Sequence, residues 1–271
     1  MADTSGMASP PPRSPVRFRG GGFLPRTNRA AAALAFAALL AAWQAAVSFG
    51  WISPVFLPSP AEIGRALSDL AVSGELWRHL SVSLTRIGLG WLLGTAVGLA
   101  AGTAMALFSL ARSVGLPMVS ALFPIPKIAL LPLLILWLGI GETSKVTTIA
   151  LGVFFPTVIA AYSGIDGVPR NLIRMAQSFD VPFRDIVRKV ALPGALPSIL
   201  AGMRVSASIA LLLLVSAEMI GAERGIGAFV LGAGNLMQTD QLMAGVAVLS
   251  GLGLAVGTLL SRTERALLGW R

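Results

Sequence analysis

Charge is scarce in this 271-residue sequence. Lys, Arg, Asp and Glu together make up 12% of the residues, whereas hydrophobic types make up 55%. Soluble domains carry about 25% charged residues, so this chain has too little charge to cover the surface of a soluble protein of its size. The shortage excludes a conventional soluble globule and a disordered chain. It indicates a polytopic membrane protein, because a bilayer requires long apolar runs.

Cysteine is absent, and His79 is the single histidine. These absences exclude a disulfide framework, a thiolate metal site and a histidine cluster. The sequence also lacks the phosphate-binding pattern G-x-x-x-x-G-K-[ST], the nucleophile pattern G-x-S-x-G and the zinc pattern H-E-x-x-H. We therefore predict no catalytic site, no metal and no cofactor on this chain. Any work that it does draws its energy from a gradient or from a partner.

The apolar runs predict an all-α membrane domain. About 20 helical residues cross the hydrocarbon core, and six segments qualify: 30–50, 87–110, 116–140, 146–165, 197–220 and 241–261. The net charge is +9, and the basic residues stand between these runs, which favours a topology signal over nucleic-acid binding. With the N-terminus inside, 14 of the 21 Lys and Arg lie in cytoplasmic segments and five lie outside. The sequence predicts a multi-pass protein with both termini cytoplasmic.

Two flanking segments have a different composition. Residues 1–29 are rich in Pro and Gly and carry five Arg against one acid, which predicts a disordered basic cytoplasmic tail before the membrane domain 30–271. On the outer side, Ser59 and Glu62 form a capping box around Pro60. Ile63, Ala66, Leu67 and Leu70 then share one face. This pattern predicts an amphipathic helix that ends near Gly74 and covers the bundle or receives a partner.

Glycines recur at every fourth position in the second run. Gly90, Gly94, Gly98 and Gly102 fall on nearly one helix face, which predicts close approach of a neighbouring helix. Gly253 and Gly257 in the last run predict a shorter version of the same contact.

The cytoplasmic segment 166–196 is long and carries two amphipathic stripes. The first stripe includes Leu172, Met175, Ala176 and Phe179, and the second runs from Phe183 through Ile186 to Val190. Pro182 separates them, because proline disfavours helix at the residue before it. The pattern predicts two short helices that project into the cytoplasm. An apolar helix face outside the bilayer must cover itself with headgroups or with a partner protein.

The same segment resembles the EAA loop of ABC-importer permeases, whose pattern is E-A-A, three residues, G, nine residues and I-x-L-P. Here Arg174-Met175-Ala176 stand at the first positions, Asp180 replaces the glycine, and Val190-Ala191-Leu192-Pro193 close the pattern. The spacing matches in full, and the identities match in part. Asp is tolerable at Asp180, because a helix-ending position often needs positive φ and Asp visits that region more readily than most residues.

The resemblance extends over about residues 31–270 to the nitrate/sulfonate/taurine branch of these permeases. It rests on segments such as Leu57-Pro58-Ser59-Pro60, Pro124-Ile125-Pro126-Lys127, 132–141 and Ser216-Ala217-Glu218. It implies the type I ABC importer (MetI-like) permease fold and a subunit of the inner membrane. It also implies a homodimer, two ABC ATPase subunits that hold ATP and Mg, and an extracytoplasmic solute-binding protein. The implied function is ATP-driven import of a small solute, an anion of the sulfonate, taurine or nitrate type.

The resemblance makes residues 171–190 the coupling element between ATPase and membrane domain. From the helix faces we expect apolar side chains in the ATPase groove and basic side chains at its rim. The expected coupling residues are Arg174, Met175, Ala176, Phe179, Asp180, Phe183, Arg184, Ile186, Arg188, Leu192 and Pro193.

Lys127 and Glu218 are the ionisable residues singled out as pathway candidates. Charges within membrane spans are candidates for function. Lys127 either faces an anionic solute or snorkels to the inner interface. Glu218 either gates the outer mouth or pairs with Arg224.

Two other functions remain compatible with the residues alone. A gradient-driven transporter or channel explains six spans and Glu218 but gives the 166–196 loop no role. A membrane-anchored scaffold uses the loop to hold a partner without transport.

Overall fold

The computed structural model describes residues 29–269, which form helices and connecting turns. The predicted tail lies outside the described residues, apart from Arg29. The elements are α1 (Arg29–Ser48), α2 (Pro60–Val72), α3 (Glu75–Leu107), α4 (Ser109–Leu122), η1 (Lys127–Leu130), α5 (Leu131–Leu138), α6 (Glu142–Asp166), α7 (Arg170–Ser178), α8 (Phe183–Ile186), η2 (Val187–Ala191), α9 (Leu192–Met219), α10 (Ile226–Asn235) and α11 (Thr239–Leu267).

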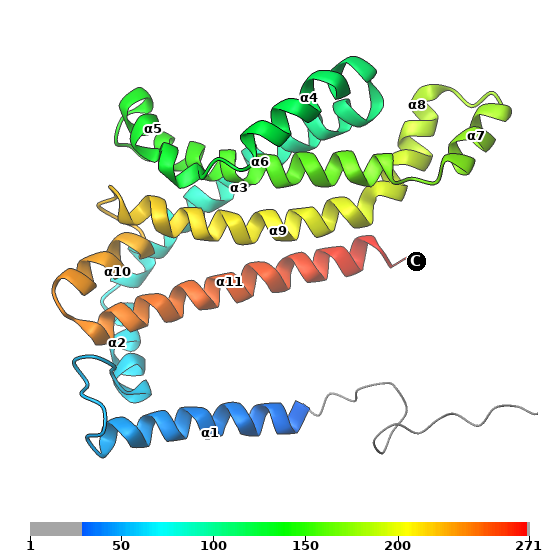
Figure 1. Cartoon of the computed structure of the whole chain (residues 1–271). Coiled ribbons are helices and arrows are strands. Elements are labelled where there is room, and N and C mark those ends of the chain that lie inside the picture. The colour runs from blue at the N-terminus through cyan, green and yellow to red at the C-terminus, as the bar shows by residue number, and fades with distance from the viewer. Residues whose placement is uncertain (1–28, 270–271) are drawn as a thin grey trace, which may run out of the picture.

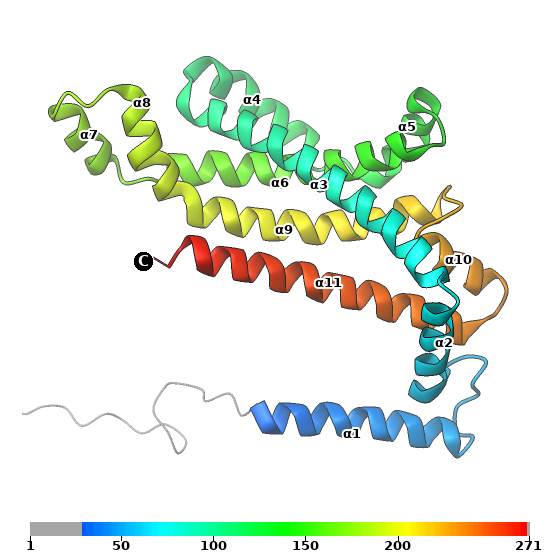
Figure 2. The same ribbon diagram turned by 180° about the vertical axis from the view of Figure 1, so that it is seen from behind.

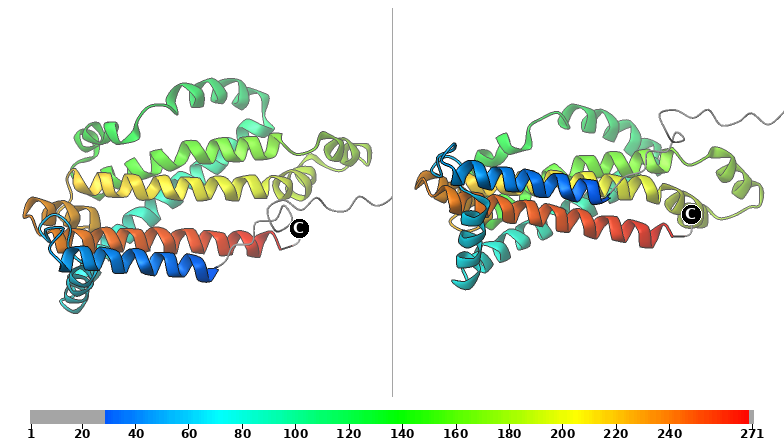
Figure 3. Two further views of the ribbon diagram at one scale, coloured as in Figure 1. Left: turned by 60° about the horizontal axis from the view of Figure 1, so that its bottom comes forward. Right: turned by 90° about the horizontal axis from the view of Figure 1, so that it is seen from below.

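Helices α3, α6 and α9 form the centre of the molecule, and α11 packs beside α9 (Figure 1). Helix α3 crosses the others at an angle (Figure 2). Ile87, Ile149, Val153, Ala210 and Leu214 make the apolar core where the three central helices meet. Helices α7 and α8 project at the end where α11 finishes, whereas α2 and α10 cover the opposite end (Figures 1 and 3).

Five helices are long and apolar enough to cross a membrane, and a bent pair makes up to six. The single helices are α1, α3, α6, α11 and the continuous run Phe183–Met219. The pair Ser109–Leu122 and Lys127–Leu138 is bent by 89°. The predicted third span is therefore broken rather than continuous, because Pro124 and Pro126 flank the bend and neither has an N–H group for a helical hydrogen bond.

The start of the second predicted span was wrong. Helix α3 begins at Glu75, twelve positions before Ile87. The predicted start at Ile87 leaves Arg86 outside the span, but this side chain is 3% exposed and lies within the helix. The helix continues through Arg86 inside the bundle because carboxylates from other helices neutralise its charge.

The predicted surface helix is confirmed as α2. The Ser59 N–H donates to Glu62 Oε2 at 2.7 Å, and the Glu62 N–H donates to Ser59 Oγ at 3.3 Å. The backbone bond from Ser59 lowers the pKa of Glu62 below its usual value. Ala66 and Leu70 pack on Ala244 of α11, so α2 covers the end of the bundle.

The four glycines of α3 form the predicted close contact, and the neighbour is α6. A Cβ on Gly94 would lie 2.4 Å from the carbonyl oxygen of Ala150, and one on Gly102 would lie 2.5 Å from that of Val158. Within the described chain no helix makes the corresponding contact with α11: Gly257 has open space where a Cβ would stand, and a Cβ on Gly253 would meet Leu211 at an ordinary 3.6 Å. Spacing alone cannot show whether a helix lies opposite the glycines.

We predict that Gly94→Ala destabilises the bundle, whereas Gly88→Ala does not. A Cβ on Gly88 meets nothing within 4 Å, so this variant should keep or gain stability through its better helix propensity. Overpacking at Gly94 should cost about 1–3 kcal/mol. Thermal unfolding of both variants in detergent measures the difference. Equal melting temperatures would contradict the close α3–α6 contact.

Candidate functional site

The segment 166–196 forms the predicted pair of helices. Helix α7 ends at Ser178, a turn follows, and α8 continues through a π-helical turn, η2, into α9. Asp180 has φ +52°, which confirms the expected left-handed conformation at the position of the family's glycine. The Val181 N–H donates to the Ala176 carbonyl at 3.1 Å and so closes the turn.

Three apolar side chains of this loop are more than half exposed. Met175, Phe179 and Phe183 are 55%, 76% and 57% exposed, respectively; we call these three residues the loop surface. Ala176 and Ile186 are buried, so they hold the loop together and neither is available at its surface. The remaining coupling candidates divide in two: Arg174, Arg184 and Arg188 are exposed, and Leu192 and Pro193 form the start of α9.

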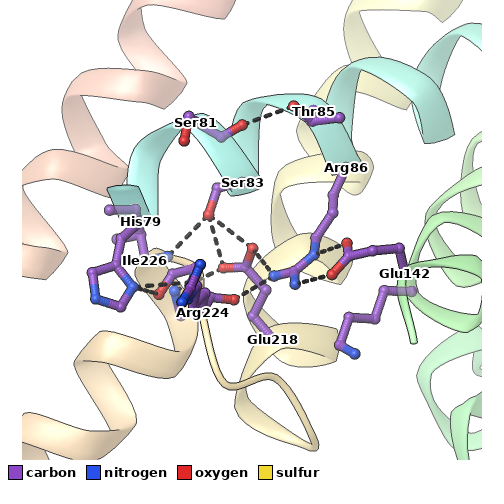
Figure 4. Close-up of polar contacts among 12 residues, drawn as sticks. His79, Ser81, Ser83, Thr85, Arg86, Glu142, Glu218, Arg224 and Ile226 are labelled. Carbon is purple, nitrogen blue, oxygen red and sulfur yellow. Dashed lines mark hydrogen bonds and ion pairs between the residues drawn. The ribbon is translucent and has the colours of Figure 1, made fainter. Parts of the chain in front are cut away.

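A second site lies at the opposite end of the bundle, where Arg86 binds two carboxylates. Its Nε and Nη2 donate to the two oxygens of Glu142 at 2.6 Å each, and its Nη1 donates to Glu218 at 2.8 Å (Figure 4). Ser83 donates to both oxygens of Glu218 at 2.8 and 3.0 Å. We call Ser83, Arg86, Glu142 and Glu218 the polar cluster. It connects α3, α6 and α9.

The loop after α9 closes over this cluster. The Arg224 carbonyl accepts from Arg86 at 2.6 Å, and the Gly227 N–H donates to Glu218 at 2.8 Å. Gly225 has φ +128°, and a Cβ there would lie 2.3 Å from a Glu218 oxygen. Glycine is therefore required at this position both by the backbone conformation and by space.

The pathway candidates have partners that the sequence did not predict. Glu218 pairs with Arg86, so of its two alternatives the pairing with Arg224 was wrong, and Arg224 takes part through its carbonyl alone. Lys127 donates to the carbonyl oxygens of Leu122, Phe123 and Ile125 at 2.7–2.8 Å. Its ammonium thereby caps the end of α4 at the bend, 4.4 Å from the ring centre of Phe155. Neither arrangement tests a place on the pathway, which stays a prediction for both residues.

Comparison with known proteins places this arrangement in a family. Residues 94–268 match the model of the binding-protein-dependent transport system inner membrane component. The chain belongs to this family. It is 39% identical to the putative aliphatic sulfonates transport permease SsuC of Bacillus subtilis, over 87% of this chain and 85% of that protein. It is 37% identical to the taurine transport system permease TauC of Escherichia coli, over 86% and 87% of the two chains.

The fold has a solved counterpart. An inward-facing structure of the MetNI methionine ABC transporter superposes with a TM-score of 0.61 at 22% identity, over 71% of this chain and 95% of that one. The resemblance to a type I, MetI-like ABC importer permease is confirmed. This chain is a transport permease of the inner membrane and not an enzyme, because members of such systems carry the ATPase on a separate subunit. In residues 29–269 no group of three or more His, Asp or Glu could hold a metal ion.

The polar cluster was missed at the sequence level, although a signal was present. Three charged residues each lie near the outer end of a predicted span. One is basic, Arg86, and two are acidic, Glu142 and Glu218. Charges at one depth in a membrane protein tend to pair with each other. The three charges are far apart in the sequence, so their pairing becomes visible only when the spans are aligned by depth.

We predict that separating Arg86 from Glu218 destabilises this permease. Arg86→Met should lower the free energy of unfolding by about 3–5 kcal/mol, because it leaves the buried Glu218 without its cation. Glu218→Met should cost less, because Arg86 keeps its contact with Glu142. The double variant should recover much of this loss. Thermal unfolding in detergent, arranged as a double-mutant cycle, provides the measurement. Additive losses would show that the two side chains do not act on each other.

Proposed function

We propose that this permease pairs with a second copy of itself and imports a small sulfonate-type anion, such as an aliphatic sulfonate or taurine. The relatives named as sulfonate and taurine permeases support the solute class. An extracytoplasmic binding protein delivers the solute. Two ABC ATPases, which hold ATP and Mg, drive the cycle. Nitrate, the other anion that the resemblance implied, is named by none of these relatives.

The observation that carries the proposal is the loop surface. Met175, Phe179 and Phe183 are exposed, and they belong to a helical pair that stands clear of the bundle (Figure 1). Exposed aromatic side chains of this kind act as anchors in protein interfaces. The neighbouring Arg184 is exposed and supplies a cation for the rim of an ATPase groove. Ile186, which is buried, is excluded from this contact.

The proposed orientation follows from the same loop. If α7 and α8 meet a cytoplasmic ATPase, then both ends of the described chain lie on the cytoplasmic side, because the start of α1 and the end of α11 are at that end of the bundle (Figure 1). The polar cluster and α2 then lie on the outer side. This placement agrees with the excess of basic residues in the predicted cytoplasmic segments.

Uptake into vesicles tests the proposed function. The complete transporter, reconstituted with its ATPase and binding protein, should accumulate labelled taurine or an alkanesulfonate only when ATP is present on the ATPase side. Uptake without ATP or binding protein would support the gradient-driven alternative. A complex that assembles without transporting either sulfonate would count against the proposed solute class.

We predict that Phe179→Ala with Phe183→Ala abolishes ATPase association. Both rings are exposed, so their removal should leave the bundle folded while deleting the main apolar anchors. Phe49→Ala with Phe56→Ala is the matched control, because these rings are 74% and 83% exposed away from the loop. Co-purification from the membrane reports association, and unfolding temperature reports the fold. Normal ATPase recovery with the first pair would remove these rings from the interface.

A further inference from the structure

An open cavity of about 500 Å³ lies beside the polar cluster. Its charged lining comes from three places: Arg86 on α3, Glu142 and Lys145 at the start of α6, and Glu223 and Arg224 in the loop after α9. The cavity is within the size range of small-molecule sites. Its floor holds two basic side chains that are each 3% exposed, Arg86 and Lys145.

Lys145 is a buried cation that no carboxylate of the described residues contacts directly. Its Nζ donates to the carbonyl oxygens of Ile140 and Gly141 at 2.7 and 3.1 Å. Within residues 29–269, no carboxylate oxygen lies within 4.0 Å of this nitrogen. An ammonium has three N–H donors, so one remains for a ligand. Burying a charge that no counter-ion contacts directly is costly, and an anion in the cavity would lower that cost.

Arg86 holds one ligand firmly and one that can exchange. Glu218, on one edge of the guanidinium, has a side chain that is 0% exposed. Glu142, on the other edge, is 63% exposed and contacts the guanidinium through both oxygens. Such a two-oxygen contact is the geometry in which guanidinium binds other oxyanions. If Glu142 swings into water, Arg86 keeps Glu218 as its counter-ion and presents a free edge to the cavity.

The charges balance only while Glu142 occupies the site. Arg86 and Lys145 carry two positive charges, and Glu142 and Glu218 carry two negative charges. The exposed neighbours Glu223 and Arg224 offset each other. Without Glu142 the floor has one excess positive charge. The start of α6 adds to it, because Gly141 provides no side-chain cap and the helix dipole favours an anion there.

We propose that this cavity binds the oxyanion group of the transported solute, with Lys145 and the free edge of Arg86 as its ligands and Glu142 as the group that it displaces. The proposal rests on the proposed import of a sulfonate-type anion and adds a place on the permease itself where that anion is received. The Glu142 carboxylate then competes with the solute for Arg86, and it occupies the site after one solute molecule has left and before the next one binds.

Equilibrium dialysis of labelled taurine against the purified permease–ATPase complex, without binding protein, tests this site. Methanesulfonate serves as the competitor, and a gluconate buffer avoids competition by chloride. Glu142→Gln should tighten binding by about five- to tenfold, because a neutral amide competes less for Arg86 than a carboxylate does. Lys145→Met should weaken binding by about tenfold or more. Arg78→Gln is the control, because it removes an exposed cation near the start of α3. This variant should leave taurine binding unchanged.

The tightening is the decisive result, because a misfolded variant cannot bind its ligand better. Binding that neither Glu142→Gln nor Lys145→Met alters would overturn the site, and so would the absence of taurine and methanesulfonate binding to the unaltered complex. ATP-driven sulfonate uptake that persists in either case leaves the proposed function intact. Failure of uptake together with the expected binding pattern would instead reject the import function and keep the anion site.

Discussion

A guanidinium inside an apolar helix bundle is the constraint on which this structure depends. Arg86 stays ionised at any ordinary pH, so burying its side chain requires negative charge beside it. The protein supplies this charge from two other helices, through Glu142 at the start of α6 and Glu218 near the end of α9. Those contacts fix the relative position of α3, α6 and α9 at one end. They also require the tight backbone of the following loop, in which Gly225 lies against Glu218.

The two ends of the permease are stabilised by different physics. One end is closed by ion pairs around the buried Arg86 and Glu218, and α2 and α10 pack at that end. The other end carries a helical pair whose apolar side chains have no cover within the described chain. Between them, the glycines of α3 let its backbone approach α6 closely, so a shift of one helix against the other would bring atoms of the two backbones into clash.

Patterns local to the chain predicted much of this fold, whereas contacts between distant segments were not predictable. The capping box at Ser59, the helical pair around Asp180 and the glycine spacing in α3 depend on neighbours a few residues away, and all three were found. The break near Lys127 and the pairing of Arg86 with Glu142 and Glu218 depend on other helices. A rule that ends a span at each charge fails where the charge is neutralised inside the bundle, as at Arg86.

The unbroken run of helix from the loop into the membrane has a mechanical consequence. Helix α9 has 28 residues, which at 1.5 Å per residue gives a rod of about 42 Å. A rotation of about 5° at its loop end would move its far end by about 4 Å, well beyond the tolerance of a hydrogen bond. Glu218 lies near that far end. Its 2.8 Å contact with Arg86 is thus sensitive to the tilt of α9. A tilt that is too small to disturb the packing at the loop end of the helix can break this contact.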